Sequence, residues 1–231
     1  TIPMLPERLC NFICSLRPDE EKLAFSVIFN LDDDANIKAY RIVHTVIKSN
    51  RRYAYEEVQQ LLEDNGVKDG TGEPAPAAPK GGYKGENADA LIQLDRLAKK
   101  LRAARFKNGA VKFDREELHF DVDEKGRPLR CYFKRSKDAN KLIEEFMLLA
   151  NRTVAESVGK VKKGMKPKTL PYRVHDNPDP QKLETLREFV VKFGYKMKTD
   201  GTKGALARSL NTLMSACEGK REQNLIQTVA L

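Results

Sequence analysis

The chain has 231 residues, and its 42 Lys and Arg against 33 Asp and Glu give a formal net charge of +9 at pH 7. This balance favours an anionic partner, nucleic acid first, although a solvated basic surface without a partner is the alternative. No stretch approaches the ~20 apolar residues that cross a bilayer, and no signal-peptide pattern opens the chain, so we expect a cytoplasmic protein without a membrane partner.

The four cysteines, Cys10, Cys14, Cys131 and Cys217, show no paired C-x-x-C spacing. This argues against a zinc site. Because they lie in apolar or mixed segments, we expect reduced thiols that are mostly packed inside the fold.

Two β-rich runs come first in the chain. Residues 23–29 alternate between apolar and other side chains, and residues 37–47 are rich in β-branched ones. Residues 30–36 between them contain three consecutive Asp, which is typical of a hairpin turn. From Tyr55 the apolar residues keep helical spacing as far as Asn65-Gly66, where we expect the helix to stop.

The composition changes between residues 67 and 87, which are mainly Gly, Pro, Ala and Lys. Large apolar side chains are almost absent, so burial cannot offset the entropy of ordering this segment. We therefore expect residues 67–87 to be a flexible insertion within one domain that spans residues 1–231.

The second half alternates amphipathic helices with short strands. Asp179-Pro180 offers an N-cap and a first-turn proline for one of the helices. A loop rich in lysine, with no aromatic residue to stack a base, favours a solvated loop over a specific RNA site. We expect helices at residues 88–101, 136–158, 180–193, 203–217 and from 220 onward, strands at 110–113, 118–122, 129–133 and 172–174, and lysines of the loop at 160, 162, 163, 166 and 168.

This order of elements predicts an α+β fold, in which a mixed sheet is combined with long amphipathic helices. Strands come first, helices dominate later, and no internal repeat is present.

Motifs for chemistry are few. Asp32, Asp33 and Asp34 could hold a divalent metal, but their place in a hairpin tip favours a role in the turn. The pair Glu56-Glu57 lies on a helix, where neighbours point about 100° apart, so it reads as solvated surface and not as an acid–base dyad. The three histidines lack metal-ligand spacing, and no phosphate-binding glycine motif is present, so we expect no nucleotide cofactor and no metal in this chain.

A basic run beside two tyrosines is the most informative local pattern. Lys48, Arg51 and Arg52 directly precede Tyr53 and Tyr55 at the junction between a strand and a helix. Cations of this kind hold phosphates, and a tyrosine ring can stack a base at ~1 to 3 kcal/mol. The alternative is a tyrosine that packs on the helix it begins.

Several strings resemble the catalytic domain of the ribonuclease II and ribonuclease R family, most closely ribonuclease R. They occur in the family's order over nearly the whole chain, and the similarity fails only in residues 67–87 and in the lysine loop. The strings are MLPERL (Met4 to Leu9), CSLRPDEEKL (Cys14 to Leu23), LIEEFMLLAN (Leu142 to Asn151), YRVHD with the following proline (Tyr172 to Pro178) and EGKREQNLIQTVAL (Glu218 to Leu231).

The resemblance implies part of an RNB-type catalytic domain from a magnesium-dependent exoribonuclease that degrades single-stranded RNA processively, 3′ to 5′, to nucleoside 5′-monophosphates. It places the metal-binding aspartates before Thr1 and an arginine segment after Leu231, so we expect no catalytic residue, no bound Mg²⁺ and no activity in this chain by itself. Arg51 to Val58 resembles the run that holds the stacking tyrosine, and Tyr55 is the matching residue. The RNA-binding candidates are therefore Lys48, Arg51, Arg52 and Tyr55. The alternative function is a non-catalytic RNA-binding or interaction module.

Overall fold

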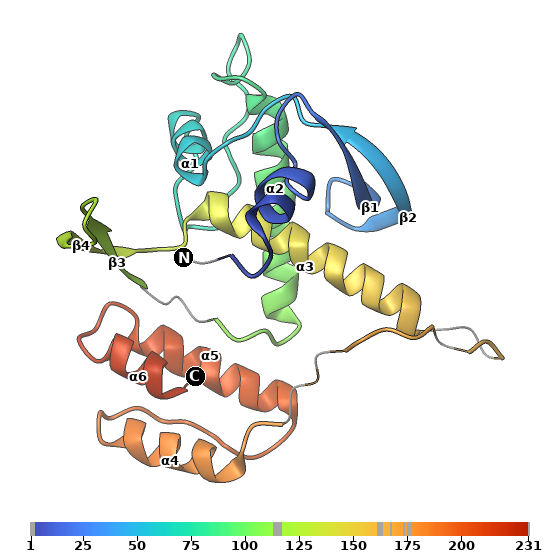
Figure 1. The fold of residues 1–231 in the computed structure, drawn as a ribbon. Helices are drawn as coiled ribbons and strands as arrows, with labels where there is room; N and C mark the ends of the chain where they lie inside the picture. Colours follow the sequence, from blue (N-terminus) through green and yellow to red (C-terminus); the bar gives the residue numbers. More distant parts are fainter. Residues whose placement is uncertain are drawn as a thin grey trace. The chain divides into compact units, whose positions relative to one another are not determined.

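The computed structural model describes residues 3–112, 117–160, 164–166, 168–172, 174 and 177–230. Figure 1 labels the helices and strands along the chain. The contacts divide the chain into two compact units. The first unit comprises Thr1–Lys100 with Asp138–Leu170, and the second comprises Leu101–Lys137 with Pro171–Leu231.

A long hairpin follows a short π-helix, η1 (Arg8–Ile13), in the first unit. Strand β1 (Glu21–Leu31) pairs antiparallel with β2 (Ile37–Lys48), in a register that sets Phe25 opposite His44. Alternation and β-branched residues favour these strands. The turn between them has Ala35 in the left-handed region, with φ of +62°.

Three helices form the rest of the first unit: α1 (Tyr55–Asp64), α2 (Ala88–Lys107), which continues into the second unit, and α3 (Asp138–Gly159). Helix α1 ends where expected, because Asn65 is followed by Gly66 with φ of +85°. Leu62 of α1 and Ile92 of α2 are fully buried in a small core.

Residues 67–87 contain no helix or strand, as expected, but they supply part of this core. Val67 and Ala75 are buried against Leu62 and Ile92. The Tyr83 hydroxyl donates to the Pro76 carbonyl at 2.6 Å. Small side chains of this segment are thus buried although large apolar ones are almost absent, and the mobility of the segment stays a prediction.

The first turn of α3 is capped by Asp69 of the same segment and by Gln59 of α1. The Asp69 carboxylate accepts from the Asp138 backbone N–H at 2.9 Å, and the Gln59 side chain accepts from the Ala139 N–H at 3.0 Å. Free N–H groups at a helix start need such acceptors. Lys99 pairs with both Asp138, at 3.3 Å, and the buried Asp95, at 2.7 Å.

The second unit contains a short hairpin and a group of three helices. Tyr195, Leu213, Cys217 and Ile226 belong to its buried core. Asp179 caps its first helix as expected, because its carboxylate accepts from the Gln181 N–H at 2.8 Å. Its elements are β3 (Glu117–Val122) paired antiparallel with β4 (Pro128–Lys134), α4 (Pro180–Val191), α5 (Lys203–Cys217) and α6 (Gln223–Ala230).

The α+β class and the long helices are confirmed, with the strands of the described residues divided between two small antiparallel sheets. Residues 110–112 form no strand, and residues 172 and 174 lie outside any strand; residues 113 and 173 are outside the described residues, as are lysines 162 and 163. No described helix is long and apolar enough to cross a membrane.

The expectation of mostly packed thiols is wrong. Cys10, Cys14 and Cys131 are exposed, and Cys217 is buried in the core of the second unit. Apolar neighbours in the sequence did not decide exposure, because Cys131 lies on a hairpin whose side chains remain largely exposed.

Candidate RNA-contact site

The junction between β2 and α1 carries all four RNA-binding candidates. Strand β2 ends at Lys48, and α1 begins at Tyr55. The start of the connection is fixed by the backbone, since the Asp19 N–H donates to the Ser49 carbonyl at 2.7 Å. Its end is supported by Glu57, whose carboxylate reaches back to the Ala54 N–H at 3.4 Å.

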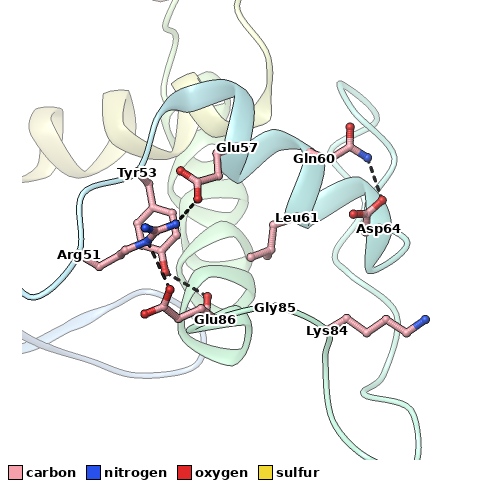
Figure 2. A pocket seen from close by; sticks show the side chains of 9 residues that line it. All are labelled: Arg51, Tyr53, Glu57, Gln60, Leu61, Asp64, Lys84, Gly85 and Glu86. Atoms are coloured by element: carbon pink, nitrogen blue, oxygen red, sulfur yellow. Dashed lines mark hydrogen bonds and ion pairs between the residues drawn. The ribbon is translucent and has the colours of Figure 1, made fainter.

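Arg51 is held by two acidic side chains. It pairs with Glu57 and, at 3.3 Å, with Glu86, and its guanidinium lies 4.9 Å from the centre of the Tyr53 ring (Figure 2). The contact with Tyr53, followed by the charges of Glu57 and Glu86, raises the pKa of Arg51 above its usual value. Glu57 is exposed, as expected for helix surface, and it is in addition an ion-pair partner of Arg51.

The two tyrosines differ in what they contact. The Tyr53 hydroxyl donates to the Glu86 carbonyl at 3.1 Å and accepts from the Asn87 side chain at 2.9 Å, so Tyr53 belongs to the packing around α1. Tyr55 is the first residue of the helix, and its side chain is 45% exposed. Of the two rings, the one at Tyr55 is open to a partner.

Lys48 and Arg52 are exposed, and neither side chain makes a hydrogen bond or an ion pair with the described residues. Lys48 lies at the end of the strand, three residues before Arg51, and Arg52 lies in the connection, three residues before Tyr55. At Lys48 and Arg52 a phosphate would displace only water. At Arg51 it would compete with the carboxylates of Glu57 and Glu86.

A hollow of about 430 Å³ lies beside α1, lined by nine residues (Figure 2). Its wall combines the Arg51, Tyr53 and Glu86 group with residues of α1 and the end of the 67–87 segment. Gly85 lets the chain pass close to α1, because a Cβ there would lie 2.9 Å from a Leu61 methyl carbon. The remaining lining residues are Glu57, Gln60, Asp64 and Lys84.

The three consecutive aspartates serve the turn, as expected. The Asp32 carboxylate accepts from the backbone N–H groups of Asp34 and Asn36 at 3.0 and 2.8 Å, and it pairs with Lys38 at 2.9 Å. Lys38, then Asn36, holds the pKa of Asp32 far below its usual value. Asp34 pairs with Lys100 of α2 at 2.8 Å.

Asp32 and Asp34 do not fit a magnesium site, because their carboxylates already have partners within the turn and on α2. Within the described residues, no group of three or more His, Cys, Asp or Glu side chains is placed to hold a metal ion. No step of a reaction can therefore be derived through a metal held by these residues.

The basic run in the sequence identified Arg51 and Tyr55 as candidates. It did not identify the residues that contact Arg51 and Tyr53. Glu86 and Asn87 lie more than 30 residues beyond Arg51, at the end of a segment with no periodic pattern. Glu57 carried one usable signal, since a Glu in the first turn of a helix is the usual partner of the residue that caps it.

The chain belongs to the RNB domain family, whose model matches residues 1–231. It is 34% identical to ribonuclease R of Aquifex aeolicus over 232 residues, which covers 99% of this chain and 30% of that protein. It is also 43% identical to the DIS3-like exonuclease 2 of Schizosaccharomyces pombe over 162 residues, covering 69% of this chain and 17% of that protein. The chain thus spans less than a third of each of these relatives.

The fold agrees with this assignment. A solved structure described as Mycoplasma genitalium RNase R in complex with double-stranded RNA superposes with a TM-score of 0.77 at 25% identity. The similarity covers 99% of this chain and 37% of that one. The resemblance noted in the sequence is therefore confirmed.

Proposed function

We propose that this chain is part of a catalytic domain of a 3′-to-5′ exoribonuclease that hydrolyses RNA processively to nucleoside 5′-monophosphates. The observation that carries the proposal is the match to ribonuclease R along 99% of the chain. The net charge of +9 suits a polyanionic substrate. The similarity to an RNase R solved with RNA supports RNA as the partner.

Within this chain the contact with single-stranded RNA is assigned to the β2–α1 junction. Tyr55 offers an exposed ring on which a base can stack, and Lys48 and Arg52 offer cations that have no partner among the residues that the structure describes. Base stacking on Tyr55 and phosphate contacts from the two cations would together hold one end of a strand without reading its sequence.

For the whole protein we propose a requirement for Mg²⁺, because the family resemblance implies it. The donors described in this chain do not fit the metal. When bound, the metal would stabilise the attacking and leaving oxygens of the displacement. We propose that the 231 residues alone release no nucleotides and that their part is to bind and orient RNA. The four cysteines are free, which supports the cytoplasm as compartment.

The test is the release of nucleoside 5′-monophosphates from single-stranded RNA with and without Mg²⁺. The protein that carries these residues should release them from the 3′ end, and the 231-residue chain should not. Release by the isolated chain would reject its inactivity. If the carrying protein binds RNA but never shortens it, the non-catalytic RNA-binding module is the correct function.

A further inference from the structure

One polar cluster in the first unit ties together stretches that are distant in sequence. Arg51 joins Glu57 on α1 to Glu86, and Tyr53 joins the Glu86 carbonyl to the Asn87 side chain. We call these five residues the Arg51 cluster. Figure 2 shows the Arg51 side chain between Glu57 and Glu86 and beside the Tyr53 ring.

We propose that Arg51 is a positioning residue and not a phosphate ligand: through its cluster it fixes the connection before α1 and so sets the direction in which Tyr55 is presented to RNA. The inference rests on the RNA contact proposed for Tyr55. It assigns different roles to Arg51 and Arg52, two adjacent residues of the same type.

Charge balance argues against Arg51 as a phosphate ligand. Its guanidinium faces two carboxylates, so bringing up a phosphate would require breaking ion pairs or adding a third negative charge to the same group. Arg52 has no such partner among the described residues. A phosphate that approaches the junction therefore meets an available cation at Arg52 and a neutralised one at Arg51.

The shape of the guanidinium explains why the cluster needs arginine. Its planar fork forms ion pairs with Glu57 and Glu86 while its face lies over the Tyr53 ring. Each ion pair is exposed, with the Arg51 side chain 43% accessible, so a single pair would add little. Three contacts made by one rigid group restrict the connection far more than any one of them. Lysine keeps the charge but has no fork or flat face to make all three.

The cluster acts on Tyr55 through the helix start. Glu57 lies on the first turn of α1, two residues after Tyr55, and its second oxygen reaches the Ala54 N–H directly before that tyrosine. Loss of Arg51 would free Glu57 and remove the ion pair to Glu86, so that the Tyr53 hydroxyl alone among the cluster side chains would hold residues 52–54 to Glu86. The Tyr55 ring would then sample several directions, and a stacked base would be held less well.

The first experiment measures stacking and phosphate contacts separately on the 231-residue chain. The probe is a single-stranded RNA oligonucleotide whose 3′-terminal base is 2-aminopurine, because its fluorescence falls when it stacks on an aromatic ring. Binding is measured over a range of salt, since each phosphate contact to a single strand contributes about 0.7 to the slope of log K against log salt. The control variant is Lys80→Ala, at an exposed position outside the site.

We expect Arg52→Ala to reduce the salt slope by about 0.7 and to keep the fluorescence quenching. Arg51→Ala and Arg51→Lys should both keep the slope and lose most of the quenching, as Tyr55→Ala does. The double variant Arg51→Ala, Tyr55→Ala should lose no more quenching than Tyr55→Ala. A reduced slope with intact quenching in Arg51→Ala, or full quenching in Arg51→Lys, would overturn the proposal.

A second readout needs no RNA. Hydrogen exchange at the amides of residues 53–58 should become faster in Arg51→Ala and in Glu86→Gln, and should not change in Lys80→Ala. Unchanged exchange in Arg51→Ala rejects the positioning role whatever RNA does. If the unmodified chain does not bind the oligonucleotide, the RNA contact itself fails, and exchange still decides whether Arg51 orders the helix start.

Discussion

Replacing Val67 by Ala tests whether residues 67–87 belong to the core of the first unit. The Val67 side chain is only 3% exposed and packs in the cluster with Leu62 and Ile92. Removing two buried carbon groups costs about 0.8 kcal/mol each, and a residual cavity adds to this, so we expect a loss of about 1.5 to 2.5 kcal/mol. A flexible insertion would lose less than about 0.5 kcal/mol.

The assay is urea unfolding followed by circular dichroism, with hydrogen exchange in α1 as the local readout for this unit. With an m-value of about 3 kcal/mol/M, the midpoint should fall by roughly 0.5 to 0.8 M. Lys80→Ala, on the exposed side of the same segment, should leave it unchanged. If Val67→Ala and Lys80→Ala had the same midpoint, residues 67–87 would not pack on the core.

Two further predictions concern the same unit. Gly85 and Gly81 share φ of +112°, but only at Gly85 would a Cβ meet a neighbour, Leu61, at 2.9 Å. Gly85→Ala should therefore destabilise by about 1 to 3 kcal/mol more than Gly81→Ala in urea unfolding, and equal effects would disprove the close approach. Burial raises the pKa of Asp95, against the attraction of Lys99. Its protonated form thus stabilises the fold below about pH 4, and this contribution is lost as pH rises through the raised pKa. Unfolding at several pH values should show Asp95→Asn gaining stability over the unmodified chain from pH 4 to pH 7; a constant or falling difference would show that Lys99 outweighs burial.

Local patterns predicted the parts of the fold that depend on neighbours in sequence. Alternation of apolar residues predicted the two strands of the long hairpin, and the run of three aspartates predicted its turn. Asp179 and Pro180 gave the start of α4. In the turn and at the helix start the decisive contact joins residues a few positions apart, so its chemistry can be read directly from the sequence.

Contacts between distant stretches could not be predicted in this way. The pairing of Arg51 with Glu86, the burial of Val67 and the capping of α3 by Asp69 all join residues that only the fold brings together. Composition gives the residue types of a segment but not their contacts, which is why burial was not expected to order the Gly- and Pro-rich residues 67–87. For the same reason Arg51 and Arg52 were both predicted to bind RNA, with no difference between their roles.

The most direct test of the account is the limit product that the protein carrying these residues leaves from 5′-labelled single-stranded RNA. With Tyr55→Ala, loss of a stacked base, at ~1 to 3 kcal/mol, should release short RNAs earlier and shift the limit product to a longer fragment. Tyr40→Ala is the matched control, because the Tyr40 side chain is also 45% exposed but lies on β2 away from the junction. An identical product ladder for Tyr55→Ala and the unmodified protein would contradict the assignment of Tyr55 as the RNA contact.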